Sequence, residues 1–229
     1  MPDIQGLLLV DKPTGPTSHD MVDRVRRVLG IRAVGHAGTL DPFASGLLIM
    51  GIGKGTKALT ALVGHDKTYE ITAILGKRTD TFDREGKILE EKTPEHLPTI
   101  EEIEHALLPF RGPIKQKAPL FSAIKQGGKK LYELARAGTA TEEQRPVRDV
   151  TVHRLELVEY AWPTLKLVAE VSSGTYIRSL VDDIGSTLQT GAYVEELRRT
   201  KIGDFDVADA VDGNHLEKDT VIEQLIPLT

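Results

Sequence analysis

The sequence predicts an α+β fold in which a mixed, mostly antiparallel central sheet is flanked by helices. Candidate strands and helices alternate along the chain, but not as the regular βα repeats of a doubly wound sheet. Two long candidate strands, residues 150–159 and 164–172, flank a Trp162-Pro163 turn and are expected to pair with each other. The 229 residues, 40% hydrophobic and 28% charged, are typical of one ordinary globular domain.

The N-terminal elements follow from short local signals. Residues 6–10 form an apolar run that ends in a Pro- and Gly-containing turn, which predicts a strand. Thr17 and Asp20 have the spacing of a capping box, and apolar residues then recur at helical intervals until Gly30. A glycine-punctuated loop is expected at residues 35–42.

The remaining elements are assigned from the same periodicities. Residues 47–52 and 69–75 are expected to be strands, the second because its apolar and polar residues alternate. The helical spacing predicts helices at residues 56–63, 100–108, 130–137 and 175–188, and residues 112–126 are expected to be extended. We expect one domain over residues 1–229, with a core at about 6–205 and an acidic tail at 206–229.

Composition excludes several classes of protein. The chain contains no cysteine, so a disulfide framework, a zinc ribbon, an iron–sulfur site and a cysteine nucleophile are all excluded. The seven histidines include no HxH or HxxxH pair, and we expect no metal. No apolar stretch is long enough to span a membrane, and the N-terminus does not begin like a signal peptide, so we expect a cytoplasmic protein.

The net charge of −5 conceals a strong segregation of charge. Residues 111–148 carry nine basic and three acidic side chains, and residues 12–36 carry five basic and two acidic ones. Residues 80–104 and 204–229 are acidic. The two basic segments could form one face that binds a polyanion, or they could be ordinary solvated surface.

Three sites of possible chemistry stand out. Residues 51–56 (GIGKGT) fit neither the GxGxxG nor the GxxxxGK(S/T) spacing of phosphate-binding loops, and they favour a glycine-rich turn. In residues 35–42 (GHAGTLDP), Pro42 would fix the backbone after Asp41, although Asp41 could instead cap a turn and His36 could be a surface residue. In residues 172–178 (SSGTYIR), Tyr176 and Arg178 could hold an anion or a flat ring, or Arg178 could be a structural ion-pair partner.

Taken together, these motifs resemble the TruB-type tRNA pseudouridine-55 synthases over about residues 7–205. The resemblance rests on ordered blocks: residues 7–13 (LLLVDKP), 35–42 (GHAGTLDP), 67–69 (KTY), 119–125 (PLFSAIK), 174–180 (GTYIRSL) and 197–200 (LRRT). It implies a pseudouridine-synthase-like catalytic domain with a central RNA-binding cleft. Many bacterial relatives continue into a C-terminal RNA-binding domain, which we expect to be absent here.

The resemblance also implies a role for each matching residue. Asp41 would be the essential nucleophile and Arg178 its ion-pair partner. Tyr69 would stack on the target uracil, and His36 would contact the RNA and help to hold the extruded nucleotide. Tyr176 and Leu197 would line the pocket, with Leu197 beneath the base.

The implied reaction is the isomerisation of uridine to pseudouridine at position 55, in the T loop of tRNA. Nothing enters or leaves during this reaction, so no cofactor is needed. The target base must be flipped out of its stack before it can react. The sequence leaves open whether Asp41 attacks C1′ or C6 of the nucleotide, or assists elimination to a glycal.

The T stem-loop of tRNA is the expected partner, and we expect a monomer that binds neither metal nor membrane. Basic side chains of the two segments are expected to contact RNA phosphates: Lys12, Arg24, Arg27, Lys115, Lys125, Lys129, Lys130, Arg136 and Arg148. Two alternatives stay open, an RNA-folding chaperone and a catalytic subunit that depends on a guide RNA.

Overall fold

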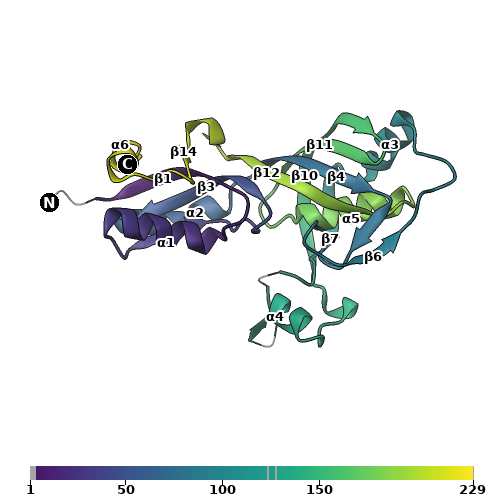
Figure 1. The fold of residues 1–229 in the computed structure, drawn as a ribbon, viewed down its shortest axis with the longest axis horizontal. Helices are drawn as coiled ribbons and strands as arrows, with labels where there is room; N and C mark the ends of the chain where they lie inside the picture. The colour runs from purple at the N-terminus through teal and green to yellow at the C-terminus, as the bar shows by residue number, and fades with distance from the viewer. Residues whose placement is uncertain (1–3, 123, 127, 229) are drawn as a thin grey trace. The chain divides into compact units, whose positions relative to one another are not determined.

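The computed structural model describes residues 4–122, 124–126 and 128–228. Its chain divides into two compact units (Figure 1). The first unit consists of Met1–Glu70 and Leu197–Thr229, and the second consists of Ile71–Glu196. Both boundaries fall inside strands, β4 (Lys67–Leu75) and β12 (Ala192–Ile202). The sequence predicted one domain and did not indicate this division.

The first unit is built on an antiparallel pair of strands. β1 (Gly6–Lys12) pairs with β3 (Ser45–Ile52) along its whole length, and β2 (Val34–Ala37) pairs antiparallel with the other edge of β3. β1 pairs parallel with β14 (Val211–Asp212), and β3 pairs parallel with residues 198–199 of β12. A short strand, β13 (Phe205–Asp206), continues antiparallel to β12.

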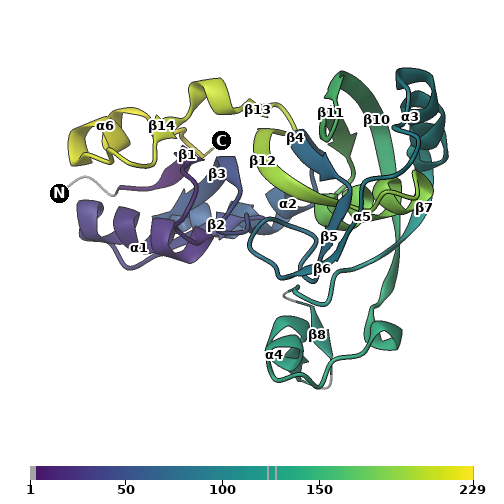
Figure 2. The ribbon, with the colours of Figure 1, turned by 45° about the vertical axis from the view of Figure 1, so that its right-hand side comes forward.

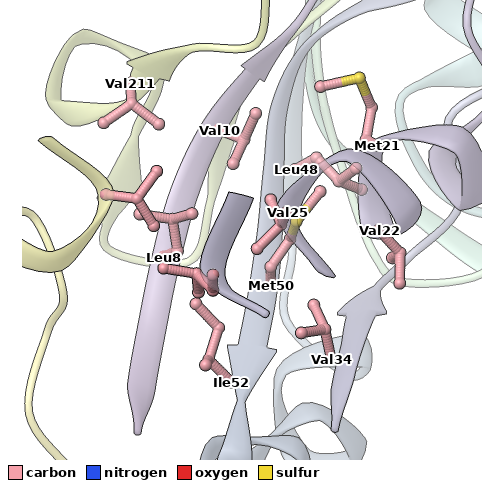
Figure 3. Packing of buried hydrophobic residues seen from close by; sticks show 12 residues of the cluster. Leu8, Val10, Met21, Val22, Val25, Val34, Leu48, Met50, Ile52 and Val211 are labelled. Atoms are coloured by element: carbon pink, nitrogen blue, oxygen red, sulfur yellow. The ribbon is translucent and has the colours of Figure 1, made fainter. Parts of the chain in front are cut away.

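The helix over residues 18–29 packs against a core cluster of this unit. α1 (Ser18–Leu29) begins with the predicted capping box of Thr17 and Asp20 and ends at Gly30, which adopts φ 69°. Its apolar side chains Met21, Val22 and Val25 pack against strand residues such as Leu8 and Met50 (Figure 3). The predicted amphipathic pattern therefore identified the buried face of this helix.

The segment after Phe205 is not a tail outside the core, which corrects the expectation from its acidic composition. Val211 pairs with Val10 of β1, and Val221 of α6 (Lys218–Glu223) is fully buried in the same cluster. The backbone groups of Leu7 and Ile226 also exchange two hydrogen bonds, of 2.9 and 2.8 Å. A few well-spaced apolar residues fix this segment although the residues around them are acidic.

The second unit contains the predicted hairpin. β10 (Val147–Ala161) and β11 (Thr164–Val171) are antiparallel and meet at a cis Trp162–Pro163 bond. β7 (Gly112–Lys117) pairs antiparallel with the other edge of β10. Figure 2 shows the helices α3 (Ile100–Leu107) and α5 (Ile177–Thr187) beside these strands. The sheet is thus mixed and mostly antiparallel with flanking helices, so the predicted fold class is confirmed.

Shorter elements complete the chain. In both views of the second unit, α4 (Leu131–Arg136) and the small hairpin of β8 and β9 before it lie apart from β10 and β11 (Figures 1 and 2). The short strands are β5 (Lys77–Thr79), β6 (Ile88–Glu91), β8 (Lys125–Gln126) and β9 (Lys129–Lys130). The short helices are η1 (Gly53–Ala58), α2 (Leu59–Val63), η2 (Leu108–Phe110), α4 (Leu131–Arg136), η3 (Glu142–Gln144) and η4 (Val207–Asp209).

Two strands that matter for the site were not predicted. β2 occupies the start of the expected loop at 35–42, and β12 contains the LRRT block. β12 does alternate between buried and more exposed residues, but Arg199 occupies one of its buried positions. A charged residue at a core position hides the two-residue period from a sequence reading. Among the described helices, none is long and apolar enough to cross a membrane.

Candidate active site

The loop between β2 and β3 carries Asp41, and its backbone is fixed on both sides of that residue. On one side, Leu40 exchanges two hydrogen bonds with the Ser18 hydroxyl, of 2.9 and 3.0 Å. On the other side, the Pro42 carbonyl accepts a 2.8 Å hydrogen bond from the Gly15 amide. Asp41 is half-buried, and its carbonyl accepts a 3.1 Å bond from the Ala44 amide. The loop is therefore a rigid support for a carboxylate.

Lys12 contributes to this support from inside the protein. Its side chain is fully buried, and its ammonium donates to the carbonyls of Pro13 and Pro16 at 2.8 Å and of Pro42 at 3.4 Å. This placement corrects the expectation that Lys12 contacts RNA phosphates, because a buried ammonium bound to carbonyls is not available to them.

Arg199 closes the same loop at its base. The guanidinium is 1% exposed and donates from Nε to the Leu47 carbonyl at 2.8 Å and from Nη2 to the Gly38 carbonyl at 3.0 Å. One side chain thereby joins the segment that enters the loop to the strand that leaves it. The sequence interpretation took Leu197 from the LRRT block and missed Arg199, since a basic residue in a strand is usually at the surface.

Two further basic groups lie around this loop. His36 is half-buried, and its Nδ1 is buried without a hydrogen-bond partner. Burial, followed by the charges of Arg199 and His19, lowers the pKa of His36, so we expect a neutral ring at pH 7. Burial and the charge of Arg199 lower the pKa of Lys67 to about 8. The Lys67 ammonium donates to the carbonyls of residues 63 and 65, at 3.0 and 2.6 Å.

Tyr69 and Leu197, the two expected walls of a base pocket, come from neighbouring strands of the sheet. Tyr69 is in β4 and Leu197 is in β12, and these strands are adjacent in the sheet order. Both side chains are largely buried, with exposures of 7% and 8%. Their contact with a uracil stays a prediction.

Arg178 lies in the first turn of α5, in the second unit, and is 5% exposed. Its guanidinium donates to the carbonyls of Thr81 and Phe121, both at 2.9 Å, and lies 3.4 Å from the Asp83 carboxylate. Asp83 is itself 5% exposed. The sequence interpretation missed Asp83 as a partner of Arg178.

The backbone of Tyr176 is held by a buried amide side chain. Gln116, 1% exposed, accepts from the Tyr176 amide at 2.8 Å and donates to the Tyr176 carbonyl at 3.0 Å. This pair of bonds fixes the entry to α5, where Tyr176 is the residue before the first helical one. The Tyr176 side chain is half-buried.

The six expected site residues therefore form two groups. Asp41, His36, Tyr69 and Leu197 belong to the first unit, and Tyr176 and Arg178 belong to the second. The expected ion pair between Asp41 and Arg178 would join the two units, as would the expected central cleft. Both stay predictions.

Apart from Lys12, the expected RNA-contacting residues of the first unit lie on α1. Arg24 and Arg27 line a surface groove of about 680 Å³ together with Arg26 and two aspartates of the same helix. Arg24 donates to the Gly213 carbonyl at 3.2 Å and Arg26 is paired with Asp23 at 2.9 Å. The groove is thus only partly basic.

The other expected RNA contacts lie in the second unit. Lys129 and Arg148 are exposed, whereas Lys130 and Arg136 lie over the ring of Tyr132, at 5.3 and 5.5 Å from its centroid. These contacts order two cations around one aromatic side chain.

Lys115 forms a 2.9 Å ion pair with Asp149, and both side chains are exposed. The hydrogen bond and the charge of Asp149 raise the pKa of Lys115. The side chain of Lys125 lies outside the described residues.

Within the part of the chain that the structure describes, no group of three or more acidic, histidine or cysteine side chains could hold a metal ion.

The fold and the site described so far consist of a mixed, mostly antiparallel sheet and a rigid loop that carries Asp41. The model of the "TruB family pseudouridylate synthase (N terminal domain)" matches residues 26–177, and that of the "tRNA pseudouridylate synthase B C-terminal domain" matches residues 178–225. The chain therefore belongs to the TruB family of pseudouridylate synthases, which confirms the resemblance.

Individual relatives agree with this assignment. A protein from Chlamydia muridarum called tRNA pseudouridine synthase B is 45% identical over 216 residues, which cover 94% of this chain and 88% of the relative. A protein of the same name from an Azoarcus species is 47% identical and is covered to 70%.

Solved structures show the same fold. A chain in the crystal structure of a Cbf5–Nop10–Gar1 complex superposes with a TM-score of 0.70 at 32% identity, and 92% of this chain is covered. A chain of an H/ACA RNP bound to a substrate RNA superposes with a TM-score of 0.66 at 28% identity. This chain spans 53% and 50% of the lengths of those two chains.

Proposed function

We propose that this protein isomerises uridine to pseudouridine at position 55, in the T loop of tRNA. The family membership supports the reaction, and the names of the relatives from Chlamydia and Azoarcus support tRNA as the substrate. The observation that carries the proposal in this structure is the aspartate loop, whose backbone is tied on both sides of Asp41.

The reaction breaks the N1–C1′ bond of uridine and forms a C5–C1′ bond. The proton that leaves C5 is balanced by the proton that N1 gains, so no atom enters or leaves and the chemistry requires no cofactor. In the proposal, the flipped-out uridine meets the Asp41 carboxylate. The rigid loop holds this carboxylate at the reacting nucleotide, and orientation of this kind supplies much of the rate acceleration of enzymes.

The detached uracil has to rotate without escaping. In the proposal, the Tyr69 ring stacks on the base and Leu197 lies beneath it. Base–aromatic stacking contributes roughly 1–3 kcal/mol and tolerates rotation of the base about the normal to its plane. Tyr176 completes the lining, and the neutral His36 ring contacts the extruded nucleotide.

Arg178 supplies the positive charge. In the proposal, its guanidinium pairs with Asp41 and keeps that carboxylate ionised as water leaves the pocket. Its bonds to Thr81, Phe121 and Asp83 support this role, because they fix the guanidinium before any RNA is bound. We propose that the enzyme acts as a monomer without metal.

The test is to incubate the purified protein with an unmodified tRNA transcript, without additives, and to map the pseudouridines. We expect one pseudouridine at position 55. Asp41→Asn should lower turnover by roughly 10⁴-fold, the scale seen when a catalytic group is removed. It should bind tRNA almost as well as the unchanged protein. Modification at another position, or full turnover by Asp41→Asn, would contradict the proposal.

The same experiment separates the two alternative functions. The similarity to the H/ACA RNP chain is the reason to test for a subunit that depends on a guide RNA. Such a subunit would leave the bare transcript unmodified. An RNA-folding chaperone would keep its biological effect in the Asp41→Asn variant. The identities of 45% and 47% to synthases named for tRNA favour the stand-alone enzyme.

A further inference from the structure

The buried hydroxyl of Ser18 is joined to the loop that carries Asp41. Ser18 Oγ donates to the Leu40 carbonyl at 3.0 Å and accepts from the Leu40 amide at 2.9 Å. Ser18 is 1% exposed and Leu40 is 3% exposed, so water does not compete for these bonds. One hydroxyl therefore satisfies both backbone groups of the residue directly before Asp41.

The other side of Asp41 is held as firmly. The carbonyl of Pro42 accepts from the Gly15 amide and from the Lys12 ammonium. Ser18, Gly15 and Lys12 all belong to one short stretch, from the end of β1 to the first turn of α1. Leu40 and Pro42, the two neighbours of Asp41, are thus both bonded to the same stretch of chain.

We propose that Ser18 is a positioning residue for Asp41. It touches neither RNA nor the reacting atoms and acts only by fixing the peptide that precedes the nucleophile. This inference rests on the proposed function, in which Asp41 reacts. The neighbouring Thr17 is exposed, and its hydroxyl bonds to the Asp20 carboxylate and amide rather than to the loop of Asp41, so two adjacent hydroxyls have separable roles.

The role has a kinetic consequence. Catalytic groups must be held within about 0.5 Å of their productive geometry, and a displacement of 1 Å costs roughly 100-fold in rate. Ser18→Ala removes both bonds and leaves the Leu40 amide and carbonyl unpaired in a buried place. We therefore expect kcat to fall by about 10- to 100-fold, while KM for tRNA changes by less than about twofold because the RNA contacts are elsewhere.

Thr17→Ala is the matched control. It removes the hydroxyl that caps α1 and should lower Tm by about 2–4 °C. Ser18→Ala should lower Tm by at least as much, because it leaves two buried backbone groups unpaired. If loss of stability alone governs activity, both variants lose kcat in proportion to their loss of Tm, which would overturn the inference. If Ser18 positions Asp41, Thr17→Ala keeps its kcat and only Ser18→Ala loses it.

Ser18→Cys is the second variant, for the case in which Ser18→Ala does not fold. A thiol is nearly the same shape but is a weak donor and acceptor. A fall in kcat of several-fold with unchanged KM supports the positioning role, and a kcat equal to that of the unchanged protein overturns it.

Amide hydrogen exchange tests the two Ser18–Leu40 hydrogen bonds without an activity measurement. In Ser18→Ala the Leu40 amide should exchange at least about 10-fold faster, whereas Thr17→Ala should leave it unchanged. Unchanged exchange at Leu40 in Ser18→Ala would overturn the inference. If the unchanged protein forms no pseudouridine but the two variants show this exchange pattern, the proposed function is refuted. The finding that Ser18 holds the peptide before Asp41 would then still stand.

Discussion

Two neighbouring aspartates of α5 differ in what surrounds them. Asp182 accepts two bonds from the Arg78 guanidinium, at 2.6 and 3.0 Å, and is 3% exposed. Asp183 is half-buried, and burial followed by the charge of Asp182 raises its pKa to about 6. Nearby cations, Arg145 and Arg78 among them, offset only part of this increase.

Asp183→Asn should therefore stabilise the protein at neutral pH. The carboxyl binds a proton more tightly in the folded state than in the unfolded one, so its contribution to stability is present below about pH 4 and is lost as the pH rises through 6. We expect the variant to unfold at a higher urea concentration at pH 7.5. The gain in unfolding free energy should be about 1 kcal/mol, less than the full pKa shift would give because solvent screens a half-exposed carboxyl, and it should vanish near pH 4. Asp182→Asn is the control and should be destabilising at pH 7.5, since Arg78 loses its partner. A lower stability of Asp183→Asn at pH 7.5 would refute the assigned shift.

Arg178→Lys tests whether the contacts that fix the Arg178 guanidinium matter for activity. A lysine keeps the charge but cannot reach the Thr81 and Phe121 carbonyls and Asp83 at once, because it lacks the planar fork of arginine. We expect kcat to fall by about 10- to 100-fold with KM for tRNA changed less than about threefold. Steady-state kinetics on the tRNA transcript would measure both, and equal losses in kcat and in affinity would contradict the assigned role.

At the scale of elements, β3 and β12 approach each other unusually closely. Gly46 adopts φ 102° opposite Arg199, and a Cβ at Gly46 would lie 2.2 Å from the Arg199 carbonyl oxygen. Gly46→Ala should therefore cost at least about 2–3 kcal/mol of unfolding free energy, from backbone strain and from the displacement of β12. Urea denaturation of the variant would measure this loss.

Gly64→Ala is the matching control for that measurement. Gly64 has φ −74°, which alanine adopts freely, and the nearest atom to an added Cβ is 3.4 Å away. Alanine here should leave stability unchanged or raise it by about 0.4–1 kcal/mol, because it restricts the unfolded chain. Equal stabilities for the two alanine variants would show that the β3–β12 contact is not as close as described.

The elements that could be predicted were those with strong local signals. The capping box and apolar spacing of α1 and the apolar runs of β10 and β11 are properties of neighbouring residues, and they identified the right elements. β12 could not be predicted because its strand character depends on burying Arg199 against the Leu47 and Gly38 carbonyls. Those acceptors are distant in sequence, so no local pattern reports them.

The same limit applies to the whole molecule and its site. The blocks of the family resemblance identified the residues proposed to react, Asp41 and Arg178. They did not identify the groups that hold those residues, such as Ser18, Arg199 and Asp83, because each acts through a contact made by the fold. Lys12 shows the converse error: its charge predicted an RNA contact, and the fold buries it.

The segregated charge of the whole chain leads to a prediction about tRNA binding. Although the net charge is −5, residues 111–148 carry nine basic and three acidic side chains, and Lys129 is exposed there. Lys166 is the matched control, because its ammonium is paired with Glu159 at 2.7 Å outside that segment. A lysine that neutralises a phosphate releases counterions, so its removal lowers the slope of log K against log salt by about one. Lys129→Ala should show this change across a salt titration of tRNA binding, and Lys166→Ala should not. Equal slopes in both variants would mean that this basic segment is solvated surface and that the RNA is gripped elsewhere.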